Sequence, residues 1–276
     1  MLRLVLLSLF MMALSGCRSL TSLYFHPHQT YYNDPADFGI KYQEVQLSTE
    51  DGETLHNWLF EAEEPLKGRV VFFHGNAENI STHFASVYWL PSYGYEVLLV
   101  DYRGFGRSTG IPKLPQVLND MVQSYHWMLA QNEEANVPVY VLGQSIGAAL
   151  STMALSELDN QPECLILDSG FASFKDMAKI GFQDSWLLWP FAYPASWLLP
   201  TEYEPQDYGA KLTSKILQIH SIEDSVVPVE QGRLLNKTFQ RVEWYETQGP
   251  HISTFNHQQH RDKVVEFFDA CRSNNP

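Results

Sequence analysis

The sequence predicts a single α/β domain built around one mainly parallel sheet. From Arg69 onward, apolar runs of strand length alternate with helical segments, which is typical of a parallel sheet covered on both faces. A chain of 276 residues with 45% hydrophobic content is long enough to bury one large core. No internal repeat, Gly/Ser linker or low-complexity run divides the chain.

The first sheet element is predicted to be a hairpin. Strand candidates at residues 41–49 and 54–62 meet at Asp51-Gly52, a dipeptide that favours a tight turn. Further along, residues 116–134 have the amphipathic pattern of a long helix.

Residues 137–147, VPVYVLGQSIG, place a serine at a sharp turn. An apolar strand leads into Gly143, and residues 146–158 are predicted to form a helix rich in Ala, Leu and Met. Strand, turn and helix in this order are the context of a nucleophile elbow, in which glycines on both sides let the backbone pack closely. We therefore expect Ser145 to be a nucleophile, exposed at the top of the sheet.

A second GxSxG pattern occurs at residues 106–110 around Ser108. It follows a polar loop instead of a strand, and Ile111-Pro112 after it disfavours a helix. The context predicts that Ser108 is a loop residue.

A serine nucleophile needs a base and an orienting carboxylate. An apolar run at residues 215–220 is followed by Glu223 and Asp224, either of which could supply the carboxylate. A strand-like alternation at residues 241–246 is followed by His251. Both positions lie just beyond the carboxyl end of a predicted strand, where open α/β sheets build their sites.

Two histidines begin the predicted terminal helix. His257 and His260 are three residues apart, a spacing that could suggest a metal pair, but no third ligand of matching spacing follows. We interpret them as a solvated helix start and expect neither metal nor cofactor.

The oxyanion donors are predicted from the loop before a helix expected near Asn79. An apolar strand ends at His74, and the loop that follows can aim a backbone N–H at the point where the amide of Ile146 also points. Asn76 is the assigned donor and Ala77 the alternative. We expect His74 to hold this loop by hydrogen bonds.

Five blocks of the chain carry a resemblance to a known family. They are HGNAEN at 74–79, DYRGFGRSTG at 101–110, GQSIG at 143–147, LDSGFASFKDMAK at 167–179 and HSIEDSVVP at 220–228. In this order they resemble the Bem-type, serine-aminopeptidase-like group of α/β-hydrolases, from about residue 24 to the end. The resemblance implies the α/β-hydrolase fold, assigns the carboxylate to Asp224, and points to esterases, thioesterases that remove acyl chains from protein, and peptidases. Two departures are Ser221, where a glycine is usual, and Ala77-Glu78, where small or glycine residues are commoner.

The N-terminus predicts export. Arg3 begins a short basic start, ten apolar residues follow, and small residues precede Cys17. The apolar core is too short to span a bilayer, so we interpret residues 1–16 as a signal peptide. The cysteine resembles the lipobox of bacterial lipoproteins, which implies a lipidated Cys17. An ordinary secretory signal with an incidental cysteine is the alternative.

The charge of the chain excludes some partners. A formal net charge of −14 argues against nucleic acid and against adhesion of the folded domain to anionic lipid, so attachment to a membrane must come from the lipid. Arg18 follows the cysteine in place of the aspartate that resembles an inner-membrane retention signal. In a Gram-negative cell this favours the periplasmic side of the outer membrane. The pattern leaves open whether Cys164 and Cys271 pair.

Aromatic residues gather in a cap-like segment, residues 171–208. Three roles fit such a set: lining an apolar pocket for an acyl chain, packing against the core helices, or contacting a membrane. The set is Phe171, Phe174, Phe182, Trp186, Trp189, Phe191, Tyr193, Trp197, Tyr203 and Tyr208.

The predicted organisation is a signal peptide at 1–16, a lipidated lead-in at 17–40 and an α/β-hydrolase domain at 41–276. The predicted function is that of a lipid-anchored serine hydrolase acting on acyl esters, thioesters or lipid-like substrates. A peptidase or amidase and a non-catalytic binding lipoprotein are the alternatives. Oligomeric state and natural substrate stay open.

Overall fold

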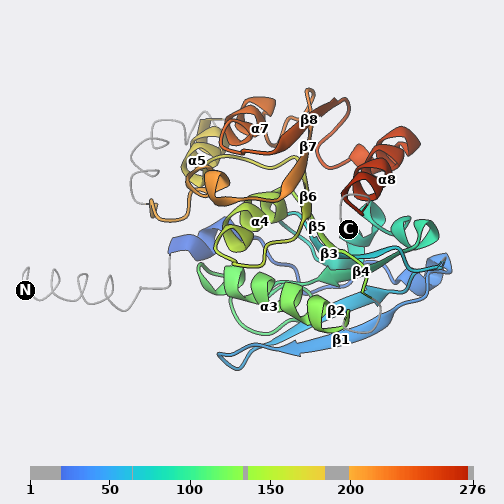
Figure 1. Ribbon diagram of the computed structural model, residues 1–276. Coiled ribbons are helices and arrows are strands. Elements are labelled where there is room, and N and C mark those ends of the chain that lie inside the picture. Colours follow the sequence, from blue (N-terminus) through green and yellow to red (C-terminus); the bar gives the residue numbers. More distant parts are fainter. Residues whose placement is uncertain (1–19, 64, 133–135, 184–198, 273–276) are drawn as a thin grey trace, which may run out of the picture.

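The computed structural model describes residues 20–63, 65–132, 136–183 and 199–272 (Figure 1). These residues form one eight-stranded sheet in the order β1-β2-β4-β3-β5-β6-β7-β8, with helices on both faces. The α/β-hydrolase fold predicted from the sequence is confirmed by this arrangement. Residues 1–16 and Cys17 lie outside the described residues, so the signal peptide and the lipid anchor stay predictions.

The sheet is antiparallel at one edge and parallel elsewhere. Strand β1 pairs with β2, and β2 with β4, in antiparallel fashion, which confirms the predicted hairpin, while every later pairing is parallel. The strands are β1 (Gln43–Ser48), β2 (Thr54–Phe60), β3 (Gly68–Phe73), β4 (Tyr95–Val100), β5 (Val139–Gln144), β6 (Cys164–Asp168), β7 (Lys215–Ser221) and β8 (Val242–Thr247).

The helices follow the predicted segments with shorter ends. The long amphipathic helix ends at Ala130, and the helix after Ser145 ends at Ser156. The α-helices are α2 (Ile80–His83), α3 (Gln116–Ala130), α4 (Ile146–Ser156), α5 (Phe174–Gln183), α7 (Val229–Asn236) and α8 (Gln258–Arg272). No helix in the described ranges has both the length and the apolar character needed to cross a membrane.

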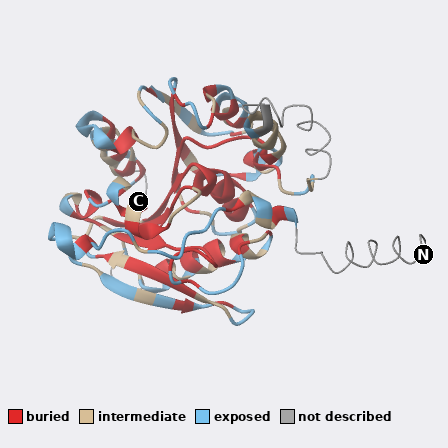
Figure 2. Ribbon diagram, turned by 180° about the vertical axis from the view of Figure 1, so that it is seen from behind, coloured by how far each residue is buried: buried red, intermediate tan, exposed pale blue. Residues whose placement is uncertain are grey.

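Alternation along each strand divides the core into two layers. In β3, Val71 and Phe73 face the layer formed with α3, α4 and α7, whereas Val70 and Phe72 face the layer that includes α2 and α8. Successive strand side chains point to opposite faces, so a strand buried on both sides reads as one continuous apolar run. Figure 2 shows the consequence, with buried residues concentrated along the strands and the helix faces that cover them.

The aromatic-rich segment is described only in part, since residues 184–198 and the side chain of Phe182 lie outside what the structure describes. Phe171 and Phe174 are buried in the core layer of α4, and Tyr203 and Tyr208 pack against the same layer. For these four rings, core packing is therefore the role that the structure supports. The pocket and membrane roles of the remaining rings stay untested.

Cys164 and Cys271 form a disulfide, a pairing that the sequence left open. Cys164 begins β6 and Cys271 lies in the last turn of α8, and both are buried. The bond ties the terminal helix to the middle of the sheet across a sequence separation of 107 residues.

A Cys164→Ala/Cys271→Ala variant should be less stable by about 2–4 kcal/mol, because a cross-link that closes a long loop restricts the unfolded chain. Urea unfolding of the oxidised protein and of the variant would measure this difference. Two additional thiols should titrate after reduction of the denatured wild-type chain. Equal unfolding midpoints and no additional thiols would contradict the pairing.

Candidate active site

Ser145 lies at the turn between β5 and α4, in a conformation that few non-glycine residues adopt. Its φ is 56° and its ψ is −119°. Its backbone N–H donates to the carbonyl of Asp168, at the end of the neighbouring strand β6, at 2.8 Å. Backbone strain of this kind costs about 1–3 kcal/mol and persists only where the surrounding structure enforces it.

The glycines of the GxSxG pattern are required by close packing. A Cβ atom on Gly147 would lie 2.1 Å from the carbonyl oxygen of Phe73, and one on Gly143 would lie 2.7 Å from the carbonyl oxygen of Gly147. Real Cβ atoms do not approach backbone this closely. Any larger residue at these positions would therefore push α4 away from the sheet.

Three side chains from distant parts of the chain meet at this turn. The imidazole Nε2 of His251 lies 2.9 Å from the Ser145 hydroxyl oxygen. Its Nδ1 lies 2.6 Å from a carboxylate oxygen of Asp224. These distances suit a tautomer in which Nδ1–H donates to Asp224 and Nε2 accepts from the hydroxyl. The arrangement can pass the serine proton to a base that a buried carboxylate orients.

Asp224 is held as the anion that this arrangement needs. Burial by itself raises the pKa of the carboxyl. The hydrogen bond with His251 and the backbone N–H groups of Val226 and Val227 lower the pKa by more than burial raises it, so the net pKa lies below its usual value. The competing carboxylate, Glu223, is engaged elsewhere, where it accepts from the backbone N–H of Gly249 at 2.8 Å. The geometry therefore favours Asp224 as the partner of the imidazole.

Ser221, one of the departures from the family pattern, joins the loop of Asp224 to the loop of His251. Its hydroxyl donates to the carbonyl of Gly249 at 2.6 Å, two residues before His251. It also accepts from the backbone N–H of Glu223 at 3.1 Å. A glycine at this position would lack both bonds.

The prediction that Ser145 is exposed is wrong, since the residue retains only 7% of its accessible surface. Two neighbours account for this burial. The His251 ring is hydrogen-bonded to the hydroxyl, and Gly75 lies so close that a Cβ on it would be 3.5 Å from the Cβ of Ser145. The turn brings the serine to the end of the sheet, but the following loops cover it.

The predicted oxyanion donors lie on either side of this close approach. Among the described residues, the backbone N–H groups of Asn76 and Ile146 donate to no other protein group. Asn76 directly follows Gly75, and Ile146 directly follows the serine. Unpaired N–H groups in these places are available to stabilise a developing oxyanion. Ala77 and Glu78, the other departure from the family pattern, have φ values of 65° and 54°.

Two buried histidines support residues 75–79, the predicted oxyanion loop. His74 Nδ1 lies 2.6 Å from the carbonyl of Gly75, and its Nε2 lies 3.3 Å from the buried carboxylate of Asp101. His83 stacks on the His74 ring, with centroids 4.9 Å apart, and its Nε2 lies 3.3 Å from the carbonyl of Ala77. The holding role expected for His74 agrees with these contacts, whereas the sequence reasoning did not identify His83.

Asp168 is a second supporting residue that the sequence reasoning missed. Its carboxylate is fully buried and accepts from Gln144 and from Thr254, each at 2.9 Å. It therefore connects the elbow to the loop of His251, and burial raises the pKa of its carboxyl despite these bonds. Its place directly after an apolar strand, in the LDSGF block, was the available signal.

Two other candidates are resolved by their surroundings. Ser108 is a buried loop residue, as predicted, and its hydroxyl donates to the carbonyl of Asp101 and accepts from the N–H of His56. The prediction that His257 and His260 form a solvated helix start is wrong for His260. This residue is buried, and its Nδ1 lies 2.8 Å from the Tyr245 hydroxyl oxygen. In the part of the chain that the structure describes, no group of three or more His, Cys, Asp or Glu side chains could hold a metal ion.

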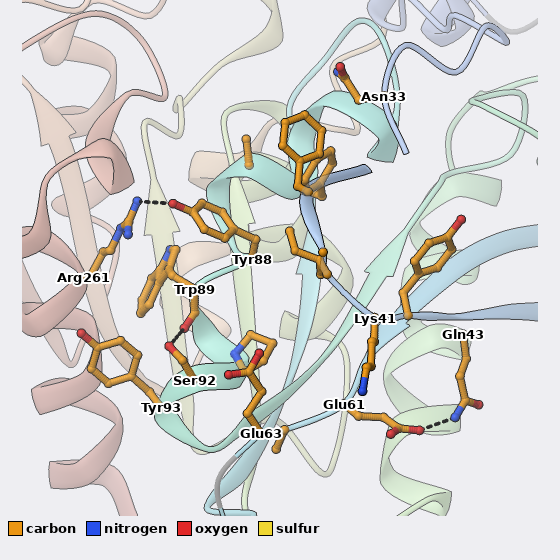
Figure 3. A pocket seen from close by; sticks show the side chains of 18 of the residues that line it. Asn33, Lys41, Gln43, Glu61, Glu63, Tyr88, Trp89, Ser92, Tyr93 and Arg261 are labelled. Carbon is orange, nitrogen blue, oxygen red and sulfur yellow. Dashed lines mark hydrogen bonds between the residues drawn. The ribbon is translucent and has the colours of Figure 1, made fainter. Parts of the chain in front are cut away.

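Two hollows flank the segment that follows the oxyanion loop. A small one of about 190 Å³ is lined by Glu78, His83 and Ile252, next to the oxyanion loop and to His251. A groove of about 1240 Å³ lies on the other side, where Lys41 and Glu61 face Tyr88, Trp89 and Arg261 (Figure 3). The two hollows share Thr82 and Ala85. Of these two hollows, the small one is nearer to His251, since Ile252 lines it, and neither is lined by Ser145, Asp224 or His251 themselves.

Comparison with protein families identifies related sequences. Residues 64–208, more than half of the chain, match the family described as serine aminopeptidase, S33. YfhR of Escherichia coli K12 is 27% identical over 86% of this chain and 85% of its own. Bem46 of Schizosaccharomyces pombe is 29% identical over 73% and 67%, respectively. The lysophosphatidylserine lipase ABHD12 of Macaca fascicularis is 28% identical over 64% of this chain and 47% of its own.

Solved structures share the fold. The esterase Pf2001 of Pyrococcus furiosus has a TM-score of 0.73 at 23% identity, with 90% of this chain and 98% of the esterase covered. An acylaminoacyl peptidase of Pyrococcus horikoshii has a TM-score of 0.62 at 18% identity, with 86% of this chain and 42% of the peptidase covered. At these identities the likeness establishes the α/β-hydrolase fold alone.

The acid stability of the protein should depend on His83. Burial, and then the neighbouring His74, lower the pKa of the His83 imidazole from 6.5 to about 3. Between these values the unfolded chain binds a proton that the folded chain does not, so stability falls as the pH drops through this window. At about 1.4 kcal/mol per unit, over the roughly 2.5 units from 6.5 down to pH 4, His83→Gln should abolish about 3 kcal/mol of the stability lost between pH 7 and pH 4.

Urea unfolding at the two pH values measures this effect. His126→Gln, which removes an exposed histidine of α3, is the matched control and should leave the pH dependence unchanged. An H83Q variant with the same pH dependence as the unsubstituted protein would refute the assignment.

Proposed function

The chain belongs to the serine aminopeptidase S33 family and is a hydrolase of the α/β fold, and from this premise we propose that it cleaves acyl esters or thioesters through Ser145. The observation that carries the proposal is the hydrogen-bonded series formed by Ser145, His251 and Asp224. A nucleophile, a base within reach of its proton and a carboxylate that orients the base are the parts that acyl transfer to serine requires.

The proposed reaction has two stages. In the first, His251 Nε2 accepts the hydroxyl proton of Ser145 as the oxygen attacks the acyl carbonyl carbon, and the resulting imidazolium then protonates the leaving alcohol or thiol. In the second, water loses a proton to His251 and attacks the acyl-serine, and the imidazolium returns a proton to the serine oxygen as the carboxylic acid leaves. The carboxylate of Asp224 stabilises the imidazolium in both stages.

The tetrahedral intermediates require donors for the negative oxygen. The backbone N–H groups of Asn76 and Ile146 are the proposed pair, and their lack of other partners among the described residues supports this role. A preorganised donor of this kind is worth about 2.7–4 kcal/mol in the transition state. Two such donors would supply a large share of the catalysis.

Esters or thioesters are preferred over peptides on two grounds. Relatives and fold neighbours include a lysophosphatidylserine lipase and an esterase. The sequence pattern also assigns no carboxylate to binding a substrate's free amine, which an aminopeptidase would need. Peptide or amide hydrolysis remains the second candidate because the family is named for an aminopeptidase and because one fold neighbour is an acylaminoacyl peptidase.

Ser145→Ala should reduce the hydrolysis of a short-chain nitrophenyl ester by at least about 10³-fold, because the nucleophile is lost while the fold is retained. Ser108→Ala is the matched control, since it alters the other GxSxG serine. It should keep turnover within about threefold, although its two buried hydrogen bonds make it less stable.

Nitrophenyl esters of increasing chain length and aminoacyl nitroanilides, assayed side by side, separate the two substrate classes. Faster turnover of the esters supports the proposal, whereas faster turnover of the anilides favours the peptidase. Equal ester turnover by S145A and the unsubstituted protein, with no fluorophosphonate labelling of either, would leave a non-catalytic binding protein as the better account.

We also propose that the chain is exported and anchored to a membrane by lipid on Cys17, on the support of the N-terminal sequence alone. A single acyl chain anchors a protein only marginally, so the several chains of a bacterial lipoprotein would be needed for stable attachment. Cys17→Ala should abolish incorporation of an alkyne-labelled palmitate and release the protein from the membrane fraction. Arg18→Ala is the neighbouring control that should keep both, and palmitate labelling of C17A would refute the anchor.

A further inference from the structure

The side chain of Asn76 is hydrogen-bonded to a segment that precedes the first strand. Its Nδ2 donates to the carbonyl of Tyr24 at 2.8 Å, and its Oδ1 accepts from the backbone N–H of His26 at 2.9 Å. The same Oδ1 accepts from the N–H of Ala77 at 3.0 Å. One amide therefore clasps two points of the N-terminal segment and one point of the oxyanion loop.

The N-terminal segment, residues 24–30, continues along the loop as a strap. The backbone N–H of His28 donates to the carbonyl of Glu78 at 3.3 Å. Asn79 Nδ2 donates to the carbonyls of His28 and Thr30, each at 2.8 Å. Every residue of the loop from Asn76 to Asn79 thus bonds to the strap or lies next to one that does.

The strap is itself fixed to the core. The Tyr24 ring stacks on Phe174, with centroids 4.3 Å apart. Phe25 is buried and meets Phe105 edge-on at 6.4 Å. The carbonyl of His28 also accepts from the N–H of Gly106 at 3.0 Å. These contacts make the strap a rigid support for the loop.

The loop needs such support because its backbone is strained. Ala77 and Glu78 both lie in the left-handed region, with φ of 65° and 54°, where neither side chain is favoured. Each such residue costs about 1–3 kcal/mol and persists only where neighbours over-determine the conformation. A loop relieved of that constraint would relax and carry the N–H of Asn76 with it.

We propose that the strap is a positioning element of the oxyanion site, and that it acts through the side chain of Asn76. The amide side chain holds the residue in place, while the backbone N–H of the same residue, next to the close approach of Gly75 to Ser145, has no other protein partner among the described residues. This inference rests on the proposed function, because it assigns the N–H of Asn76 to the oxyanion. It adds that residues 24–30, which precede the sheet, hold this N–H in place.

Asn76→Ala separates the two parts of this residue, because alanine keeps the backbone N–H and loses all three side-chain bonds. We expect kcat for a nitrophenyl ester to fall by about 10- to 100-fold with KM changed by no more than about twofold, since an oxyanion donor acts mainly in the transition state. The inhibition constant of an alkyl boronic acid, which forms a tetrahedral adduct with the serine, should rise by a similar factor. Fluorophosphonate titration measures the concentration of active sites. Dividing the rate by that concentration keeps a loss of folded protein from appearing as a lower kcat.

Two further variants complete the experiment. His26→Ala removes an exposed strap side chain but keeps the N–H that bonds to Asn76, and it should keep kcat and the boronate constant within about twofold. Asn79→Ser retains a hydroxyl that can cap α2 but loses both donations to the strap, and it should lower kcat by about 3- to 10-fold. It keeps the proposal testable if N76A does not fold.

The outcomes distinguish this inference from the proposed function. Ser145-dependent turnover in the unsubstituted protein, with N76A and N79S both within about twofold of it in kcat and boronate inhibition, would overturn the role of the strap alone. Absence of Ser145-dependent turnover in the unsubstituted protein would overturn the proposed function and the strap's role with it. A fall in kcat matched by an unchanged boronate constant would also count against the strap, because the oxyanion site would then be intact.

Discussion

The carbonyl oxygen of Phe73, at the end of β3, faces a position where only glycine fits. A Cβ on Gly147 would lie 2.1 Å from that oxygen, so α4 begins directly against the end of the strand. The chain can reach this position from β5 only through a tight turn, and Ser145 takes the strained conformation at its apex. The same approach brings the N–H of Ile146 beside the loop that leaves β3. One backbone contact thus sets the position of Ser145, the proposed nucleophile, and of Ile146, whose N–H is a proposed oxyanion donor.

Comparison of the two GxSxG copies shows that the contact, and not the motif, determines the chemistry available to the serine. Ser108 is as buried as Ser145, but its hydroxyl is committed to the carbonyl of Asp101 and to the N–H of His56. No imidazole nitrogen is bonded to it in the described part of the chain. A strand before the serine and a helix after it direct the hydroxyl to the carboxyl edge of the sheet, where loops from β7 and β8 can deliver an acid and a base.

Most of the fold and the convergence of three side chains could be predicted because they depend on local pattern and chain order. Strand alternation, the Asp51-Gly52 turn and the elbow are each encoded within a few neighbouring residues. The failures concern burial produced by distant segments. The cover over Ser145 comes from Gly75 and His251, and His260 is buried by its contact with Tyr245. The Cys164–Cys271 bond likewise depends on how α8 crosses the sheet, which no local pattern specifies.

The departure at Ala77-Glu78 acquires a physical meaning from the strap. Glycines in the left-handed region would relieve the strain but would leave the loop free to move, because glycine has the largest backbone entropy to lose. Alanine and glutamate limit that freedom at the cost of strain, and the bonds from residues 24–30 offset the cost. The backbone of residues 24–30, before the first strand, is therefore proposed to support the loop beside Ser145. The strap begins seven residues after Cys17, so the lipid proposed on that cysteine would keep the strap within reach of a membrane surface, where substrates that carry acyl chains lie.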